Sequence, residues 1–395
     1  MRLVVKLALG IVSGIIIGLI APEFLTRVFV TFKEIFGQFL GFTIPLIIIF
    51  FIASGIASFG KESGKMLGLT SAIAYASTIL AGTLAFLVAL IVIPTLIGNG
   101  GGAAEEATGF EPFFELTIDP ITGVMTALVA AFVFGIGITR IKSPTLHAFF
   151  DEGKEIIERL IWKIIIPILP FYIASIFAEL AADGTVFETL KAFGLVLVTA
   201  VIVHWIWLVV LYLVAGGYTG RNPFTALKNM LPAYFTGLGT MSSAATIPVT
   251  VQSTKNNKVR DGVADSAVPL CATIHLSGST ITLVLCSVAV MVLSNNLSMP
   301  TFGMMMPFIF MLGIIMIAAP GVPGGAVMAA LGLLSTMLGF DETALGLMIG
   351  LYMAQDSFGT ATNVTGDGAI AIIVDKVTRK NAGVYEKGNQ VASKN

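Results

Sequence analysis

The chain has 395 residues, of which 56% are hydrophobic and only 11% charged, with a net charge of −1 and a mean hydropathy of +0.94. Ordinary soluble domains carry about 25% charged residues, so this composition excludes a soluble enzyme. The near-neutral charge and the absence of a basic tail give no indication of a nucleic-acid partner. Apolar runs of about 20 residues recur along the chain, and each can cross a hydrocarbon core about 30 Å thick. We therefore predict an all-α polytopic membrane protein embedded in the lipid bilayer.

The first apolar run, 3–20, continues into Pro22 without a small-residue cleavage pattern, and further spans follow it. We therefore interpret it as a transmembrane helix and not as a signal peptide. The next spans are expected at roughly 36–58, 66–97, 120–138, 160–180 and 190–217.

Beyond residue 217 the pattern becomes less regular. The stretch 232–251 is rich in Ser and Thr, 262–293 is long and broken, 300–337 contains a Pro/Gly-rich segment, and 345–374 is the last apolar run. We interpret the Ser/Thr-rich and Pro/Gly-rich stretches as re-entrant hairpins that enter from opposite sides, each followed by a full span. Irregular backbone at membrane depth is tolerated where it lines a cavity, and such an inverted repeat is typical of secondary transporters.

Basic residues predict the topology. Of the 22 Lys and Arg residues, all but Arg27, Lys33 and Lys191 lie at the termini or in alternate connections, whereas the loop 98–119 carries acidic residues and no base. The positive-inside rule then places both termini in the cytoplasm and the protein, with eight full spans, in the plasma (cell inner) membrane. The cysteines, Cys271 and Cys286, lie in one apolar run about 22 Å apart along a helix, too far for a disulfide, and are expected to be packing residues.

Polar residues form a stripe in the last span. Asp356, Thr360, Asn363 and Asp367 follow one another at offsets of 4, 3 and 4 residues, which places them on one face of a helix. A chain of structural hydrogen bonds between helices is one interpretation of this stripe. Two carboxylates without partners favour a site for a cation and an ammonium group.

The broken span and the two hairpins supply further candidates. The broken span contains Gly278 among hydroxyl residues, which suggests an unwound helix with free carbonyls, and it also contains His275. An ordinary buried histidine and one that carries protons or shapes an ion site both fit this position. The first hairpin, 240–248, offers hydroxyls and free N–H groups suited to a carboxylate. The second, 319–325, offers backbone and motion, which suits a gate.

These residues resemble the dicarboxylate/amino-acid:cation symporters, the family of the glutamate transporters, in its neutral amino-acid branch of sodium/serine-threonine symporters. The matching motifs, found mainly in the C-terminal half of the chain, are Asn363-Val-Thr-Gly-Asp367, Gly321-Val-Pro-Gly, Ser242-Ser243 before Thr246-Ile-Pro-Val, and Pro269-Leu-x-Ala-Thr-Ile. The resemblance implies an elevator-type glutamate-transporter fold, eight transmembrane helices plus the two hairpins, assembled as a homotrimer.

The resemblance also implies a division into domains. Helices one and two (1–65), and helices four and five with the acidic loop (99–181), would form a scaffold. Helix three (66–98) and the remainder (182–395) would form a mobile transport domain. That remainder comprises helix six, hairpin one (222–257), helix seven (260–294), hairpin two (300–339), helix eight (341–380) and a cytoplasmic tail.

By position, the resemblance assigns ligand contacts residue by residue. Asp356 would hold the substrate ammonium, Asn363 and Thr360 its carboxylate, and the other substrate contacts would come from Ser242, Ser243, Ser279, Val322, Gly324 and Gly359. Sodium would be held partly through backbone by Cys271, Thr273, His275, Asn363 and Asp367, at a second site by the backbone of Met316, Ile317 and Ala319, and at a third site by Tyr75, Thr78 and Ser277.

Departures from the family pattern refine this expectation. Members with acidic substrates place an arginine at the position of Gly359 or of Met241, and this chain has neither. A bound aspartate would leave a buried carboxylate unpaired, so we expect a small neutral amino acid such as serine, threonine or alanine. The family motif Asn-Met-Asp-Gly is here His275-Leu-Ser277-Gly, and losing that aspartate predicts coupling to fewer sodium ions.

A proton-coupled or acidic-substrate (dicarboxylate) symporter is the alternative, with His275 as the residue that would carry a proton. An intramembrane aspartyl protease would need facing carboxylates, but Asp356 and Asp367 lie about 16 Å apart on one helix. The hairpins favour a carrier over a channel.

Overall fold

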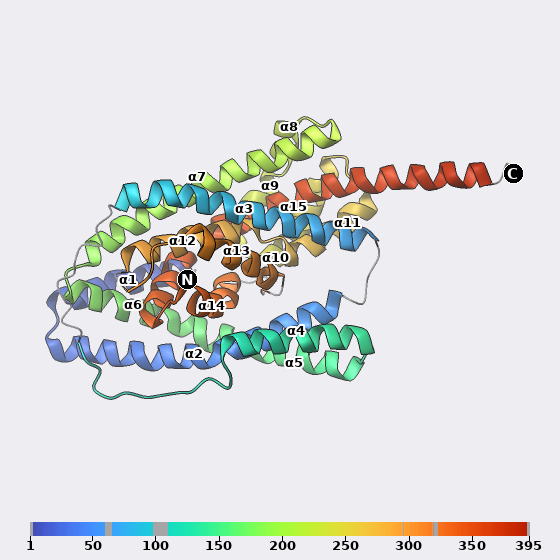
Figure 1. Cartoon of the computed structure of the whole chain (residues 1–395). Helices are drawn as coiled ribbons and strands as arrows, with labels where there is room; N and C mark the ends of the chain where they lie inside the picture. The colour runs from blue at the N-terminus through green and yellow to red at the C-terminus, as the bar shows by residue number, and fades with distance from the viewer. Residues whose placement is uncertain are drawn as a thin grey trace.

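The structure is a computed structural model that describes residues 3–59, 65–97, 110–294, 296–317, 319 and 323–392. Within these ranges every regular element is a helix, as the composition predicts (Figure 1). The helices are α1 Leu3–Ile20, α2 Glu23–Phe59, α3 Lys65–Ile97, α4 Val124–Ile141, α5 Pro144–Leu160, the π-helical turn η1 Ile161–Ile165, α6 Ile166–Ala182, α7 Val186–Thr219, α8 Pro223–Asn229, α9 Leu231–Thr240, α10 Ser243–Asn256, α11 Asp261–Ile274, α12 Ser277–Leu293, α13 Phe302–Met316, α14 Gly325–Leu338 and α15 Glu342–Ala392.

Six of the described helical segments are long and apolar enough to cross a membrane. They are Glu23–Ala57, Gly68–Thr95, Val124–Ile141, Pro144–Ala182, Val186–Thr219 and Asp261–Leu293. Shorter apolar helices are Val5–Ile20, Phe302–Met316 and Gly325–Leu338. Because these segments follow one another along the chain, the fold is that of a multi-pass membrane protein.

The helices pack in two groups. The first, here called the α2 group, consists of α1, α2, α4, α5 with η1, and α6, which pack on one another. The second, the α15 group, consists of α3 and α7 to α15, with α15 in contact with most of the others. In Figure 1, α2, α4 and α5 run along the bottom, α3 and α7 along the top, and α12 to α15 lie between them. The two groups meet where α14 packs on α2 and α4, and where α15 packs on α6.

Within the α2 group, α1 and α6 approach each other unusually closely. Three glycines one helical turn apart, Gly10, Gly14 and Gly18, face the backbone carbonyls of Pro170, Ala174 and Ala178. A Cβ built on these glycines would lie only 2.1–2.4 Å from those oxygens. The two helices therefore touch backbone to backbone, a contact that small residues permit in membranes.

Three helices differ from the predicted spans, and one of them, α15, continues to Ala392 and does not end near residue 374 or 380. The helix α2 begins at Glu23 and not near residue 36, because polar residues on its first turns find partners on a neighbouring helix: the buried Lys33 Nζ lies 2.7 Å from Glu179 Oε2 of α6. The predicted span 160–180 is the second half of a longer helical run that starts at Pro144, where Ser143 caps the helix by accepting from Leu146 N.

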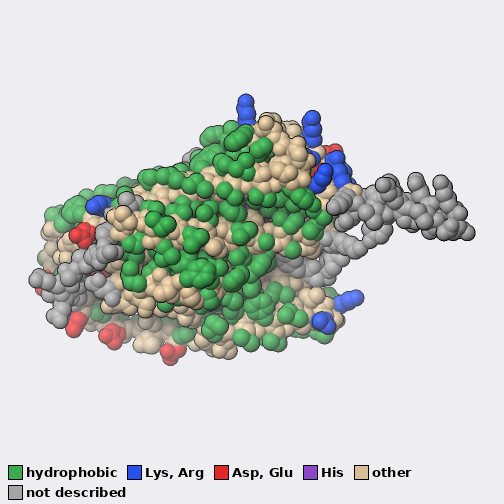
Figure 2. All heavy atoms as spheres, turned by 45° about the horizontal axis from the view of Figure 1, so that its top comes forward, with side chains coloured by type: hydrophobic (Ala, Val, Ile, Leu, Met, Phe, Trp, Pro, Cys, Tyr) green, Lys and Arg blue, Asp and Glu red, His purple; other side chains and the backbone are tan. Residues whose placement is uncertain are grey.

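Charged side chains gather at opposite ends of the molecule. Figure 2 shows Lys and Arg at one end of the visible face and Asp and Glu toward the other, with hydrophobic side chains between. At the basic end, Arg260 Nε lies 2.6 Å from Asp375 Oδ1, and Arg221 and Arg379 also pair with this carboxylate. This polarity agrees with the uneven distribution of basic residues in the sequence.

Candidate functional site

The predicted interruption in the broken span is present between α11 and α12. Helix α11 ends at Ile274, His275 and Leu276 leave helical geometry (φ −106° at both, ψ 81° and 46°), and α12 begins at Ser277. The break lies against α15, where a Cβ on Gly278 would come within 2.3 Å of the Gly359 carbonyl oxygen. Only glycine permits this approach, so the free N-terminus of α12 is held directly against the polar stripe of α15.

Asn363 of α15 fills that N-terminus. Its Oδ1 accepts from the N–H of Gly278 at 2.8 Å and of Ser279 at 3.2 Å, and its Nδ2 donates to Ser279 Oγ at 3.0 Å. These are the N–H groups that a helix leaves without partners at its start. Asn363 therefore positions Ser279 and closes the helix end in this conformation.

Asp367 pairs with the buried imidazole at the break. His275 Nδ1 lies 2.9 Å from Asp367 Oδ1, and His275 Nε2 lies 2.8 Å from Ser77 Oγ of α3. Neither His275 nor Asp367 has any exposed surface. The imidazole thus links α3, the break and α15 in one chain of polar contacts.

Asp356 is held by the second hairpin. Its Oδ2 accepts from the backbone N–H of Gly324 at 2.7 Å. Gly324 has φ +75°, a left-handed conformation that favours glycine, and it directly precedes α14. The Tyr352 hydroxyl, one turn before Asp356, lies near the same carboxylate and Ser279. One carboxylate thus connects α15 to the tip of hairpin two.

The tip of the first hairpin lies between α9 and α10. Met241 adopts a left-handed conformation (φ 55°), and Ser242 caps α10 by accepting from Ala245 N at 3.2 Å. Thr246 Oγ1 lies 3.0 Å from Thr240 Oγ1, and Ser243 is buried. Both helices pack on α15, and Gly237 of α9 faces Ala361 and Val364. The hairpin therefore approaches the polar stripe from its own side.

Two of the remaining predicted substrate positions, Gly359 and Thr360, lie on α15. Gly359 and Thr360 are buried, and a Cβ on Gly359 would point toward Ser279 N and Thr282 Oγ1, each 3.4 Å away. Val322 lies outside the described residues. The described part of the stripe thus faces the start of α12 and the tip of hairpin two.

The predicted sodium-site residues are less tightly grouped. Tyr75 donates to Phe310 O of α13 at 3.2 Å, and Thr78 donates to Ala74 O within its own helix. Thr273 is exposed and donates to Leu270 O. The Cys271 carbonyl accepts from His275 N, while Met316 and Ala319 are buried and Ile317 is half-buried. Their role as ligands stays a prediction.

Asp367 has the chemistry to hold a hard cation. Its Oδ2 is buried and has no hydrogen-bond partner among the described residues, and the same is true of the hydroxyls of Ser277, Thr280 and Thr365. A buried carboxylate oxygen without a partner is costly, and oxygen ligands suit Na⁺. The described residues contain no group of three or more His, Cys, Asp or Glu side chains that could hold a metal.

Three residues that contact the helix break or the polar stripe were not predicted from the sequence. Ser77 reaches His275, His204 Nε2 of α7 lies 3.0 Å from the Gly278 carbonyl, and Tyr352 lies near Asp356. Tyr352 had a signal, since it stands four residues before Asp356 on the same helical face. Ser77 and His204 had none, because their contacts join residues far apart in the chain.

Comparison with known proteins identifies the family of the chain. A family model described as the sodium:dicarboxylate symporter family matches residues 3–377. The chain belongs to this family. It is a family of transporters and not of enzymes.

Curated relatives in the family include excitatory amino acid transporter 1 from Ambystoma tigrinum and from Homo sapiens. The first is 30% identical over 315 residues and the second 31% identical over 316 residues. In both cases the match covers 77% of this chain and 57% of the relative. The chain thus matches little more than half the length of these sodium:dicarboxylate symporter relatives.

Proposed function

We propose that the chain is a sodium-coupled symporter of a small neutral amino acid such as serine, threonine or alanine. The observation that carries the choice of substrate is the charge of the interior. Among the described residues, Lys33 is the one Lys or Arg whose side chain is buried, and it pairs with Glu34 and Glu179 near the start of α2. A second substrate carboxylate would find no buried cation beside the stripe, and an unpaired buried charge costs several kcal/mol.

The substrate ammonium is assigned to Asp356. Its carboxylate is buried and accepts a hydrogen bond from Gly324 N. An ammonium group at this position would form a charge-assisted hydrogen bond. Such a bond is stronger than the present bond from the neutral N–H of Gly324. The substrate carboxylate is assigned to Asn363 and Thr360, with the N–H groups and hydroxyls of hairpin one and of Ser279. Binding would require Asn363 to exchange its bonds to the start of α12 for bonds to the substrate.

Sodium is assigned to Asp367. The buried oxygen without a partner supports this assignment, and a bound Na⁺ would supply the positive charge that the carboxylate lacks. In this chain His275 takes the other oxygen of Asp367, and Ser277 stands where relatives have an aspartate. We therefore propose coupling to fewer sodium ions than relatives with the full acidic motif.

The transport movement is assigned to an elevator. The α2 group would be the scaffold, assembled as a homotrimer in the plasma membrane with both termini cytoplasmic, and the α15 group would carry the substrate. Support comes from the packing, because helices within each group contact one another more extensively than they contact the other group. Hairpin two would be the gate, and the hydrogen bond from Gly324 N to Asp356 would be present when this gate is closed.

Acidic amino-acid or dicarboxylate symport is the second candidate. The names of the relatives, excitatory amino acid transporters, favour it. It would need a cation to enter the pocket, and proton coupling through His275 would be one way to lower the negative charge there.

Thermal unfolding of the detergent-purified protein against all twenty amino acids, in sodium and in potassium, separates these candidates. A ligand at 100 times its Kd stabilises by about 2.7 kcal/mol. We expect stabilisation by serine, threonine or alanine that needs sodium, none by aspartate, and loss of the response in Asp356→Asn. Stabilisation of the wild type by aspartate would overturn the choice of substrate, and equal shifts in potassium would overturn sodium coupling.

A gain-of-function pair tests the same point from the other side. Met241→Arg places a cation at the tip of hairpin one, at a half-buried position. We expect this variant to respond to aspartate, whereas the uncharged variant Met241→Gln does not. No response to aspartate in Met241→Arg, with the serine response retained, would show that residue 241 does not face the substrate.

A further inference from the structure

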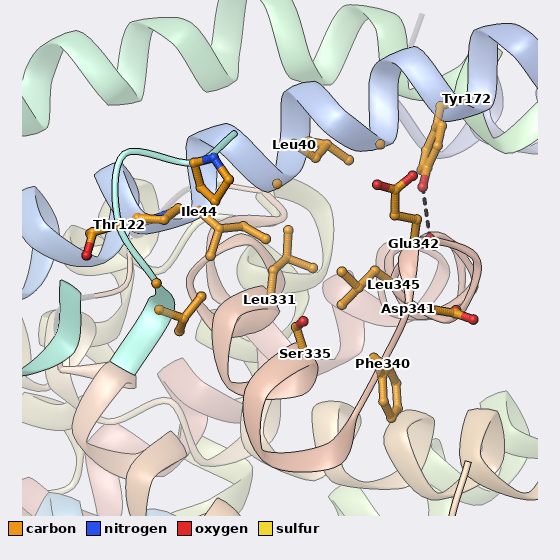
Figure 3. Close-up of a pocket in the computed structure, with 16 residues that line it drawn as sticks. Leu40, Ile44, Thr122, Tyr172, Leu331, Ser335, Phe340, Asp341, Glu342 and Leu345 are labelled. Carbon is orange, nitrogen blue, oxygen red and sulfur yellow. Dashed lines mark hydrogen bonds between the residues drawn. The ribbon is translucent and has the colours of Figure 1, made fainter. Parts of the chain in front are cut away.

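A cavity lies between the two helix groups, away from the polar stripe. Its volume is about 280 Å³, and its wall is formed by α2, the segment 120–124, Tyr172 of α6, α14 and the start of α15 (Figure 3). Most of the lining is apolar and includes Leu40, Ile44 and Leu331. An apolar cavity of about 150 Å³ is enough to hold benzene, so this one has room for a larger apolar body.

Two carboxylates line the cavity, Asp341 and Glu342, and in Figure 3 the Asp341 side chain points away from Leu331 and Ile44. Glu342, the first residue of α15, reaches from α15 toward α2, and Gln38 Nε2 donates to its Oε1 at 3.0 Å. Tyr172 donates to the backbone carbonyl of Glu342 at 3.0 Å and not to its carboxylate. The second carboxylate oxygen, Oε2, is buried and has no hydrogen-bond partner among the described residues. An acceptor in this state gains more from a donor than one already solvated.

The charges around Glu342 favour a cation. Glu34, which also lies within hydrogen-bonding reach of the Glu342 carboxyl, and Asp341 add negative charge, and Lys33 is the positive group that acts on it. Lys33 is already engaged, with its Nζ 2.7 Å from Glu179 and 3.3 Å from Glu34. Asp341 is exposed and its Oδ1 accepts from Ala344 N. The Glu342 carboxylate at the cavity wall therefore lacks a cation of its own.

We propose that this cavity binds a small amphipathic monocation, a primary ammonium on a compact apolar body, with the ammonium on Glu342 and the body against Leu40, Ile44 and Leu331. The chemistry follows from the wall, since ligand pockets are mostly apolar with a few polar groups that fix orientation. The occupant is unlike an amino acid, because the wall offers no cation for a carboxylate.

The cavity's position gives such a ligand a consequence. Its walls come from both helix groups, so a bound molecule would hold α14 and the start of α15 against α2. If the α15 group moves during transport, as proposed above, the ligand would inhibit transport without competing with the substrate. Binding itself does not depend on that movement.

The test uses 1-adamantanamine, with 1-adamantanol as an uncharged probe of the same shape. Binding to the detergent-purified full chain is followed by thermal unfolding and by calorimetric titration, without sodium and without amino acids, so that failure of the proposed transport function would not affect the result. We expect the amine to bind at least tenfold more tightly than the alcohol.

Two variants remove the site in different ways. Glu342→Gln keeps the shape of the side chain and removes its charge, and it should weaken amine binding at least tenfold while leaving alcohol binding unchanged. Gly41→Leu fills the cavity, since a Cβ on this lining glycine would meet nothing within 4 Å, and it should weaken binding of both probes.

Matched controls are Asp265→Asn, an exposed carboxylate of α11 that does not line the cavity, and Gly194→Leu, a helical glycine of α7 that also faces open space. Both should bind the amine as the wild type does. Equal binding of amine and alcohol, or unchanged amine binding in Glu342→Gln, would overturn the role of Glu342. Unchanged binding in Gly41→Leu would overturn the location.

Discussion

The two hairpins have similar shapes and opposite chemistry. Hairpin one, α9 and α10, brings hydroxyl side chains to its tip, and its main packing partners are α8, α11 and α15. Hairpin two, α13 and α14, is almost entirely apolar, offers a backbone N–H to Asp356, and packs on α2 and α4. A Cβ on Gly332 of α14 would meet Ile44, Ile48 and Val124 at 2.7–3.0 Å.

This difference indicates that the two hairpins have different roles. Hairpin one lies within its own helix group and is anchored at its base, where Arg221 bonds to the carbonyl oxygens of Asn257 and Lys258 and to Asp375. Hairpin two touches both groups, so its position depends on how the groups are arranged. In the proposed function, side chains for recognition would come from the anchored hairpin, and the hairpin between the groups would contribute backbone.

The largest effect is expected at the tip of hairpin two. In Gly324→Ala the new Cβ would lie 2.8 Å from Met353 Sδ, at a φ of +75° that disfavours side chains. The cost of about 2 kcal/mol falls on the conformation that binds Asp356, so substrate affinity should fall at least tenfold in a binding titration.

The control for this prediction is Gly339→Ala at the other end of α14. It has almost the same φ, +74°, but its Cβ would meet only Leu297, at 4.0 Å. It should lower the melting temperature without changing substrate affinity. Equal loss of affinity in both variants would show that the tip contact with Asp356 has no special role.

A smaller effect is expected in hairpin one. Gly237→Ala places a Cβ 2.9 Å from Val364 Cγ2 and 3.1 Å from Ala361 Cα, which should destabilise the protein by about 1–2 kcal/mol in thermal unfolding. Gly239→Ala, two residues later in α9, faces open space and should be neutral or slightly stabilising. If both variants unfold alike, α9 does not pack on α15 as described.

The smallest expected effect is a loss of stability at acidic pH. Burial raises the pKa of Asp375, but hydrogen bonds and charge from Arg260 and Arg379 outweigh burial and hold this pKa below the ordinary aspartate value. A carboxylate whose pKa is lowered on folding stabilises the fold at pH above its unfolded value, about 3.9. That stabilisation is lost as the pH falls through the folded pKa.

Hydrogen exchange between pH 7 and pH 3 measures this effect. Protection at the base of hairpin one should fall in acid, whereas Asp375→Asn should show low protection throughout and a flatter pH dependence. Asp265→Asn, which removes the exposed partner of Lys255, is the control and should keep the wild-type profile. A wild-type pH profile in Asp375→Asn would contradict the assignment.

Much of the architecture could be predicted from the sequence because it depends on local periodicity. Hydropathy located most of the apolar helices, and the 3.6-residue period placed Asp356, Asn363 and Asp367 on one buried face. Gly278 among hydroxyls located the break in the helix.

The partners of these residues could not be predicted in the same way. The helical period shows which face of a helix is buried but not which neighbouring helix packs on that face. The contact of Ser77 with His275 and the capping of α12 by Asn363 are therefore visible only in the tertiary structure. The early start of α2 was missed for a related reason. Lys33 is a charged residue, so hydropathy alone does not predict that it is buried. It is buried because it pairs with Glu179.

The close approach of α1 and α6 has a consequence for substitutions in the first helix. Replacing Gly14 by leucine would make the segment more hydrophobic and would leave every topology prediction unchanged. It would also force a side chain into the space where the Ala174 carbonyl lies 2.3 Å from the Cβ position. Val12, on the exposed side of the same helix, has no such neighbour to displace. On the face of α1 that meets α6, volume is the property that a substitution must preserve, and polarity is secondary.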